Sequence, residues 1–262
     1  MSSSCVVYLP DYANGKAKSM KYLHKAGIRG VSSYRTDFTE QRVLTSQSAY
    51  VPLKDHNGIH MSRLVDIIRE LEGEPIEMDD SILELLALSH DTANSYWDCA
   101  WESLHDTEEN QSLKTACRLE GVKRDKDVKW YVTLEVPYTS VCPCSHEMVK
   151  AKGHGIPHMQ RAKARVTGLL NPNEDLSTAI CTAISKICNA VVLIPLPRMK
   201  RKDELAWCER AADTNLFVED AAREVAKAID NWFNDWVVVC EHEESIHQHN
   251  VVAVCRKGDE LR

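Results

Sequence analysis

Hydrophobic residues in the second half of the chain alternate in two stretches and then recur with a helical period. The segments DVKWYVTLEVPYTSV (127–141) and RAKARVTGLL (161–170) are rich in β-branched or alternating apolar residues, so both predict strands. Apolar residues share one helical face over 176–192 and again over 217–236, which predicts two helices. Two further strands are predicted within 236–257.

The first half shows the same order of elements in weaker form. Two strand-like stretches lie between 27 and 53, two helical periods between 61 and 93, and two alternating stretches between 94 and 122. The order strand, strand, helix, helix, strand, strand therefore occurs twice. We predict an α+β fold with a duplicated ββααββ unit, antiparallel sheets and helices on one face. The charged turn VKRDKD is the best boundary, which gives units 1–122 and 123–262.

Composition and charge narrow the class of protein. Hydrophobic residues make up 44% and charged residues 27% of the chain, as in ordinary soluble proteins, and the net charge of −7 argues against a general nucleic-acid or membrane partner. The N-terminal residues lack the pattern of a secretory signal, and no apolar window is long enough for a membrane span. We therefore expect a cytoplasmic protein whose ten cysteines are reduced, some buried and some available to a metal.

The segment SVCPCSHEMVKAKGHGIPHMQR (140–161) concentrates thiols and imidazoles. Cys142 and Cys144 flank a proline, and His158 follows at a distance that lets the chain loop back. A thiolate and an imidazole suit Zn²⁺ or Fe²⁺. Taken alone, buried thiols beside surface histidines explain this segment equally well.

A second cluster, CEHEESIHQHN (240–250), lies between two predicted strands. His247 and His249 are spaced to project on the same side of an extended chain. A neighbouring carboxylate such as Glu244 would suit a histidine to proton transfer. The alternative is a charged turn exposed to solvent.

Two further segments carry groups that suit an anionic substrate. PRMKRKDELAWCERAADTNLFVED (197–220) joins the two predicted helices, and its basic residues could hold phosphate. Glu204 and Glu219 occupy loop or helix-start positions, where a glutamate is commonly only a partner of the helix dipole. The segment NGIHMSRL (57–64) starts a helix and offers backbone N–H groups and Arg63 to an anion.

Together these segments resemble the type IB GTP cyclohydrolases, which make 7,8-dihydroneopterin triphosphate from GTP. The resemblance rests on TSVCPCS with HMQR, MKRKDE with FVED, GIHMSR, and EESIHQH. The motifs occur in the family's order, and the step from Glu204 to Glu219 also matches. The resemblance implies the tunnelling fold, with two ββααββ units per chain and most of the site in the second. It also implies a homo-oligomer, expected to be a tetramer, with active sites at subunit interfaces.

The resemblance further implies a metal site and a reacting end. One divalent metal, Zn²⁺, Fe²⁺ or Mn²⁺, would be held by Cys142, His158 and Glu204. The imidazole ring of guanine would be opened at C8 with release of formate. The groups implied at the reacting end are Cys144, Glu244, His247 and His249.

The expected substrate-binding set combines the resemblance with the distribution of charge. Glu219 would accept hydrogen bonds from the guanine edge. Charge and loop position favour cations for the triphosphate, and the GIHMSR motif adds a histidine. These residues are His60, Arg63, Arg161, Lys200 and Arg201.

Two alternatives stay open at this point. The chain could be a related tunnelling-fold enzyme that acts on a pterin or deazaguanine precursor. It could also be a non-catalytic relative that binds purine or metal.

Overall fold

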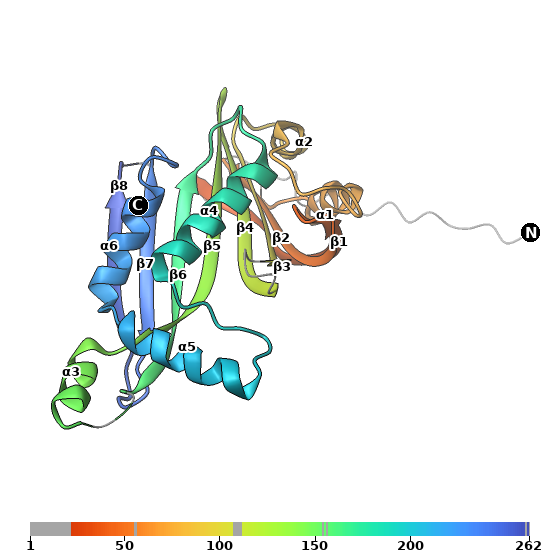
Figure 1. Ribbon diagram of the computed structural model, residues 1–262. Helices are drawn as coiled ribbons and strands as arrows, with labels where there is room; N and C mark the ends of the chain where they lie inside the picture. The colour runs from red at the N-terminus through yellow and green to blue at the C-terminus, as the bar shows by residue number, and fades with distance from the viewer. Residues whose placement is uncertain are drawn as a thin grey trace, which may run out of the picture.

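The computed structural model describes residues 22–54, 57–106, 112–153, 155, 157–259 and 261, and these form one eight-stranded antiparallel sheet with helices packed on it (Figure 1). The strands are β1 Leu23–Thr36, β2 Arg42–Leu53, β3 Ser95–Asp106, β4 Ser112–Arg124, β5 Asp127–Val141, β6 Met159–Leu169, β7 Trp236–Glu243 and β8 Val251–Lys257. The helices are α1 Met61–Glu70, α2 Asp80–Ser89, α3 Pro143–Ala151, α4 Leu176–Val191, α5 Arg201–Asp213 and α6 Val218–Ile229. Each strand pairs with its neighbours in sequence order.

The fold class predicted from the sequence is wrong in its division of the sheet. We predicted an α+β tunnelling fold with two tandem ββααββ units, whereas one sheet runs through both halves. Strands β4 and β5 pair up to Arg124↔Asp127, because a two-residue turn joins them. Asp125 in that turn has φ +54°, a conformation that aspartate tolerates better than most residues. In addition, the described residues of the second half form four helices rather than two.

One face of the sheet forms the core. In β5 the alternate residues Trp130, Val132, Leu134 and Val136 are at most 4% exposed. The helices pack on this face in order along the sheet: α1 contacts β1, α2 contacts β3, α4 contacts β5 and α6 contacts β8. The apolar stripe of each helix therefore covers its own part of the sheet. Among the described residues, no helix is long and apolar enough to cross a membrane.

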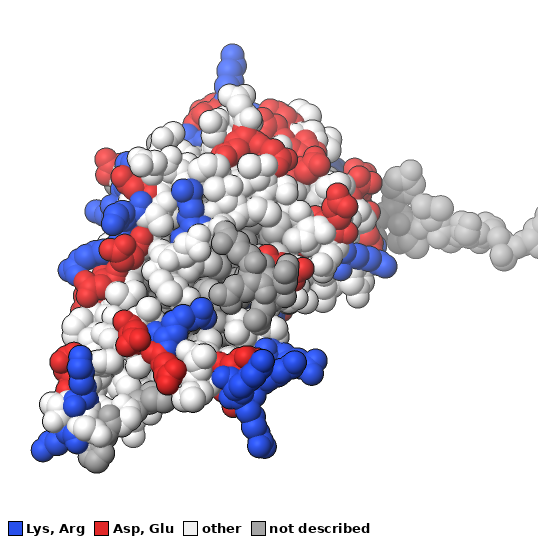
Figure 2. All heavy atoms as spheres, viewed as in Figure 1, with Lys and Arg blue, Asp and Glu red and all other residues white. Residues whose placement is uncertain are grey.

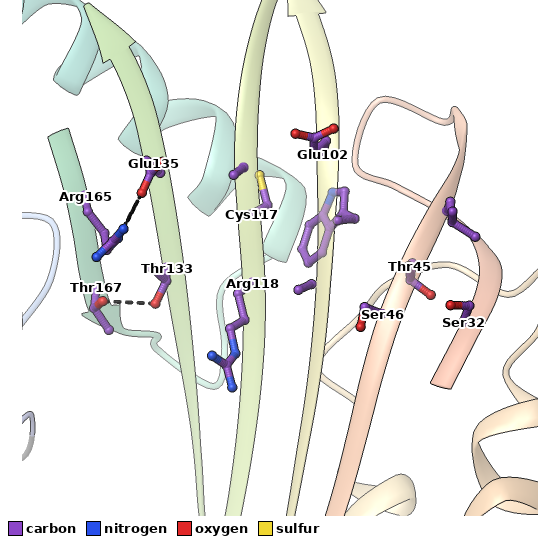
Figure 3. Close-up of a pocket in the computed structure, with 14 residues that line it drawn as sticks. Ser32, Thr45, Ser46, Glu102, Cys117, Arg118, Thr133, Glu135, Arg165 and Thr167 are labelled. Carbon is purple, nitrogen blue, oxygen red and sulfur yellow. Dashed lines mark hydrogen bonds and ion pairs between the residues drawn. The ribbon is translucent and has the colours of Figure 1, made fainter. Parts of the chain in front are cut away.

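The opposite face of the sheet is open and polar. It holds a shallow hollow of about 670 Å³ over β1 to β6 (Figure 3). Its polar side chains bond to each other: Arg165 pairs with Glu135 at 2.6 Å, and the hydroxyls of Thr133 and Thr167 lie 2.9 Å apart. Arg118 reaches the carboxylate of Asp98 on β3 at 3.2 Å. Each of these side chains therefore has a partner on the same face of the sheet.

Helices α3 and α5 lie at the lower end of the sheet in Figure 1, and the sequence pattern predicted neither. Helix α3 begins with Pro143 in its first turn, where the missing N–H of proline costs nothing. Helix α5 begins at Arg201 and has Asp203 and Glu204 in its first turn, the charge that a helix N-terminus favours.

Candidate active site

A cleft of about 480 Å³ opens where β5 and β7 end and β6 and β8 begin. Its lining comes from segments that are far apart in the sequence: the start of α3, the start of β6, the start of α6 and the β7–β8 loop. Seven predicted site residues lie in it, namely Cys142, Cys144, His158, Glu219, Glu244, His247 and His249.

Strand register explains why these segments meet. Val141 pairs with Met159, so the residues just outside the β5–β6 ladder, Cys142 and His158, face the same end of the sheet. The β6–β7 ladder ends with Arg161 opposite Glu243. Antiparallel pairing thus brings one end of three neighbouring strands together.

The thiols lie at the start of α3. Cys142 is the residue before the helix, with an extended backbone that the following proline favours, and its side chain is half-buried. Cys144 lies in the first turn and is exposed. Both cysteines are free thiols, so both are available to a metal or a substrate.

The imidazole of His158 is oriented by a neighbouring hydroxyl. Its Nδ1 atom lies 3.1 Å from Oγ of Ser245, in the β7–β8 loop. Metal-binding histidines commonly use their second ring nitrogen in this way, because the bond sets the tautomer and the orientation of the ring. Nε2 of His158 is therefore the nitrogen that suits a ligand.

The β7–β8 loop also presents a pair of stacked imidazoles. The rings of His247 and His249 lie 5.3 Å apart between centroids, with 14° between their planes. Their spacing of two residues predicted that they project on one side. Both side chains are exposed and line the cleft, so a molecule bound there can contact them.

A buried histidine that the sequence analysis assigned no role lies in the wall of the cleft. His242 is 2% exposed; its Nε2 lies 2.8 Å from the hydroxyl of Tyr138, and its Nδ1 lies 3.1 Å from Oγ of Ser140. Gln160 donates from Nε2 to Glu244 at 2.9 Å. The alternation of β7 could have revealed His242, because it shares a face with Val238 and Cys240, both fully buried.

Burial lowers the pKa of His242 to about 4, although the negative charges of Glu244 and Glu219 act in the opposite direction. The imidazole is therefore neutral at pH 7. Between pH 6.5, the ordinary pKa of histidine, and about pH 4, the unfolded chain binds a proton there that the folded chain does not.

The free energy of unfolding is therefore expected to fall as the pH drops through this window, by at most about 1.4 kcal/mol per pH unit from this group. The substitution His242→Gln removes the titration. Urea unfolding at pH 7 and pH 4.5 should show the variant less stable than the wild type at pH 7, with a smaller deficit at pH 4.5. A deficit that stays constant with pH would contradict the assignment.

The remaining predicted residues lie outside the lining of this cleft. Glu204 is exposed in the first turn of α5, and Lys200 and Arg201 are exposed at its start. Figure 2 shows a cluster of basic side chains over this start of α5. Arg161 is exposed on β6, opposite Glu243.

The predicted anion site in the first half is a separate pocket. His60 and Arg63 line a hollow of about 200 Å³ at the start of α1. The backbone N–H of His60 donates to Nε2 of His90 at 3.0 Å, and Arg63 donates to the carbonyl of Ser89 at 3.0 Å. Within one chain, this pocket and the cleft draw on different residues.

Comparison with known proteins assigns the chain to a family. The family model of type I GTP cyclohydrolase FolE2 matches residues 9–253. The chain belongs to this family. It is 28% identical to the GTP cyclohydrolase FolE2 of Thermotoga neapolitana over 96% of this chain and 98% of that protein. It is 31% identical to the FolE2 protein of Syntrophotalea carbinolica over 82% of this chain and 81% of that protein.

Among solved structures, the uricase of Arthrobacter globiformis has a similar fold. The TM-score is 0.56 over 93% of this chain and 95% of the uricase, with 7% sequence identity. At that identity the likeness concerns the fold alone.

Two of the three predicted metal ligands of this FolE2 chain lie together and have side chains that suit a divalent metal. Cys142 and His158 line one cleft, whereas Glu204 does not. Over the described ranges, no three or more His, Cys, Asp or Glu side chains gather closely enough to hold a metal. A sulfur and an imidazole nitrogen remain a suitable pair for Zn²⁺ or Fe²⁺, whereas Mn²⁺ would also need an oxygen ligand such as a carboxylate.

Proposed function

We propose that this chain is a GTP cyclohydrolase of type IB, a metal-dependent hydrolase that opens the imidazole ring of GTP at C8. The products would be formate and 7,8-dihydroneopterin triphosphate. The observation that carries the proposal is the gathering of seven reactive side chains from four segments in one cleft. The FolE2 family match supports the same reading.

Guanine would bind at the start of α6. Glu219 lies in the first turn of this helix and lines the cleft. Its carboxylate can accept hydrogen bonds from the ring N–H and the exocyclic amine of guanine, and a paired acceptor of this kind rejects purines that lack the donors. The exposed side chains of Phe217 and Ile246 line the same cleft and suit the flat faces of a purine.

A divalent metal would be held by Cys142 and His158, with Glu204 as the proposed third ligand. When bound, it would supply Lewis acidity and lower the pKa of a coordinated water. Glu204 lies outside the cleft lining, so its place in the ligand set rests on the sequence resemblance.

Proton transfer would fall to the β7–β8 loop. As water adds to C8, His247 or His249 would donate a proton to the ring nitrogen that receives the electron pair. Glu244 would orient the reacting groups, with its carboxylate held by the 2.9 Å hydrogen bond from Gln160. Cys144, exposed at the cleft, would complete the reacting end.

The triphosphate would require cations, and no lysine or arginine is among the described residues that line the cleft. Arg161, Lys200 and Arg201 are exposed in the second half of the chain and are the proposed cations. His60 and Arg63 line a different pocket, so they would serve the substrate only if a second subunit supplied them. We therefore propose a homo-oligomer, a tetramer, with active sites at subunit interfaces.

The direct test is anaerobic incubation of the purified chain with GTP and, in turn, Zn²⁺, Fe²⁺ and Mn²⁺. We expect equal amounts of formate and of a pterin that fluoresces after oxidation, with at least one metal. Turnover of a pterin precursor but not of GTP would replace the proposal with a related activity. Binding of GTP without formate would indicate a non-catalytic protein.

A further inference from the structure

A chain of buried polar groups runs beneath the cleft, where hydrophobic residues would be expected. Tyr138, Ser140 and His242 are 2%, 4% and 2% exposed. Buried polar groups cost stability unless they are hydrogen-bonded, and these three bond to one another through both nitrogens of the imidazole.

The three side chains bond in series when the imidazole of His242 carries its hydrogen on Nδ1. The Tyr138 hydroxyl donates to Nε2 of His242, and Nδ1–H of His242 donates to Oγ of Ser140. The Ser140 hydroxyl is then free to donate to the carbonyl oxygen of Leu216, 3.4 Å away. This arrangement requires a neutral imidazole, which burial of His242 provides.

The chain ends at the helix that carries Glu219. Leu216 immediately precedes Phe217, the N-cap residue of α6, and this cap has no side-chain hydrogen bond of its own. Helix starts without a capping side chain fray more easily. The hydrogen bond from Ser140 therefore ties the residue that precedes the N-cap of α6 to the sheet.

The imidazole of His242 also contacts Gln160, the residue that holds the carboxylate of Glu244. Nε2 of Gln160 lies 3.4 Å from Nδ1 of His242 and donates to Glu244 at 2.9 Å. Gln160 is 6% exposed, so its amide has little room to turn away. His242 thus contacts Gln160, which holds the carboxylate of Glu244, and Ser140, which bonds to the backbone just before the helix that carries Glu219.

We infer that His242 is a positioning residue. Through Ser140 and the start of α6 it fixes the position of Glu219 in the cleft. It also packs against Gln160, the residue that holds the carboxylate of Glu244. The inference rests on the proposed function, because it assigns Glu219 to the guanine edge. His242 would not exchange protons with the substrate. It would instead affect how strongly the enzyme prefers guanine over other purine bases.

The test compares GTP with ITP, whose base lacks the exocyclic amine. In Ser140→Ala the tie to α6 is lost while the imidazole stays. We expect the preference for GTP over ITP, as a ratio of kcat/KM values, to fall roughly tenfold, mainly through a higher KM for GTP.

The matched control is Ser95→Ala, because Ser95 is another buried strand serine whose hydroxyl donates to a backbone carbonyl, that of Leu83 on α2, at 2.6 Å. This variant should lose similar stability and keep the GTP preference. If Ser140→Ala fails to fold, Tyr138→Phe removes the donor to Nε2 and should show the same loss.

An unchanged preference in both cleft variants, with a wild type that discriminates, would overturn the inference and leave the proposed function standing. A wild type that does not turn over GTP would instead overturn the proposed function, and the inference with it.

Discussion

Replacement of Cys142 by alanine is expected to abolish metal retention and to lower kcat/KM for GTP at least about a thousandfold. The thiol is half-buried at the cleft, next to His158 in the strand register, whereas the other thiol of the cleft, Cys144, is exposed in the first turn of α3. The measurements are metal content of the purified variant by mass spectrometry and formate release under saturating metal.

The matched control is Cys181→Ala, since Cys181 is an exposed cysteine on α4 that lies outside the cleft. It should keep both metal and activity. Metal retained at wild-type stoichiometry by the Cys142 variant would show that the ligand is another residue. The same assay applied to Glu204→Gln tests the third ligand, which should also lose metal.

Replacement of Glu219 by glutamine is expected to lower kcat/KM for GTP roughly a thousandfold or more. The amide keeps the size of the side chain but replaces one acceptor oxygen with a donor, which opposes a donor on the guanine edge. The start of α6 stays tied to Ser140, so the fold should survive. Steady-state kinetics and GTP binding by calorimetry measure the loss.

The control on the same helix is Glu224→Gln, because Glu224 is exposed on α6 and lies outside the cleft. It removes the same charge and should leave GTP kinetics unchanged. Equal losses in the two variants would mean that Glu219 acts through general charge and not through contact with the base.

Secondary structure was predictable where burial imposes a period. The interval 127–141 matches β5, and 176–192 matches α4 to one residue, because each buries a regular face. Helices α3 and α5 were not predicted. Helix α3 has no buried residue and α5 has only Ala211, so neither carries an apolar stripe that periodicity could detect.

The order in which the strands pair was harder to predict from the sequence. Alternation shows which face of a strand is buried, but not which strand lies beside it. The turn after Arg124 looked like a boundary because it is charged, yet a tight turn between two alternating stretches also makes a hairpin. That hairpin merges the predicted sheets into one.

Part of the candidate site was predictable for the same reason. Residues adjoining strand ends, such as Cys142 and His158, converge because strand pairing brings those ends together. Glu204 and Lys200 lie on or beside a helix that the sequence pattern did not reveal, so their location could not be anticipated. His242 was overlooked because a histidine in a charged segment suggested exposure, although its place in the alternation indicated the core.

The central claim is that guanine binds in the cleft beside the thiol and imidazole. A crystal structure of the chain with Zn²⁺ and a GTP analogue that resists ring opening tests it most directly. We expect the purine edge within hydrogen-bond distance of Glu219, with the metal on Cys142 and His158 next to C8. A nucleotide bound in another pocket, with the metal away from Cys142, would contradict the account.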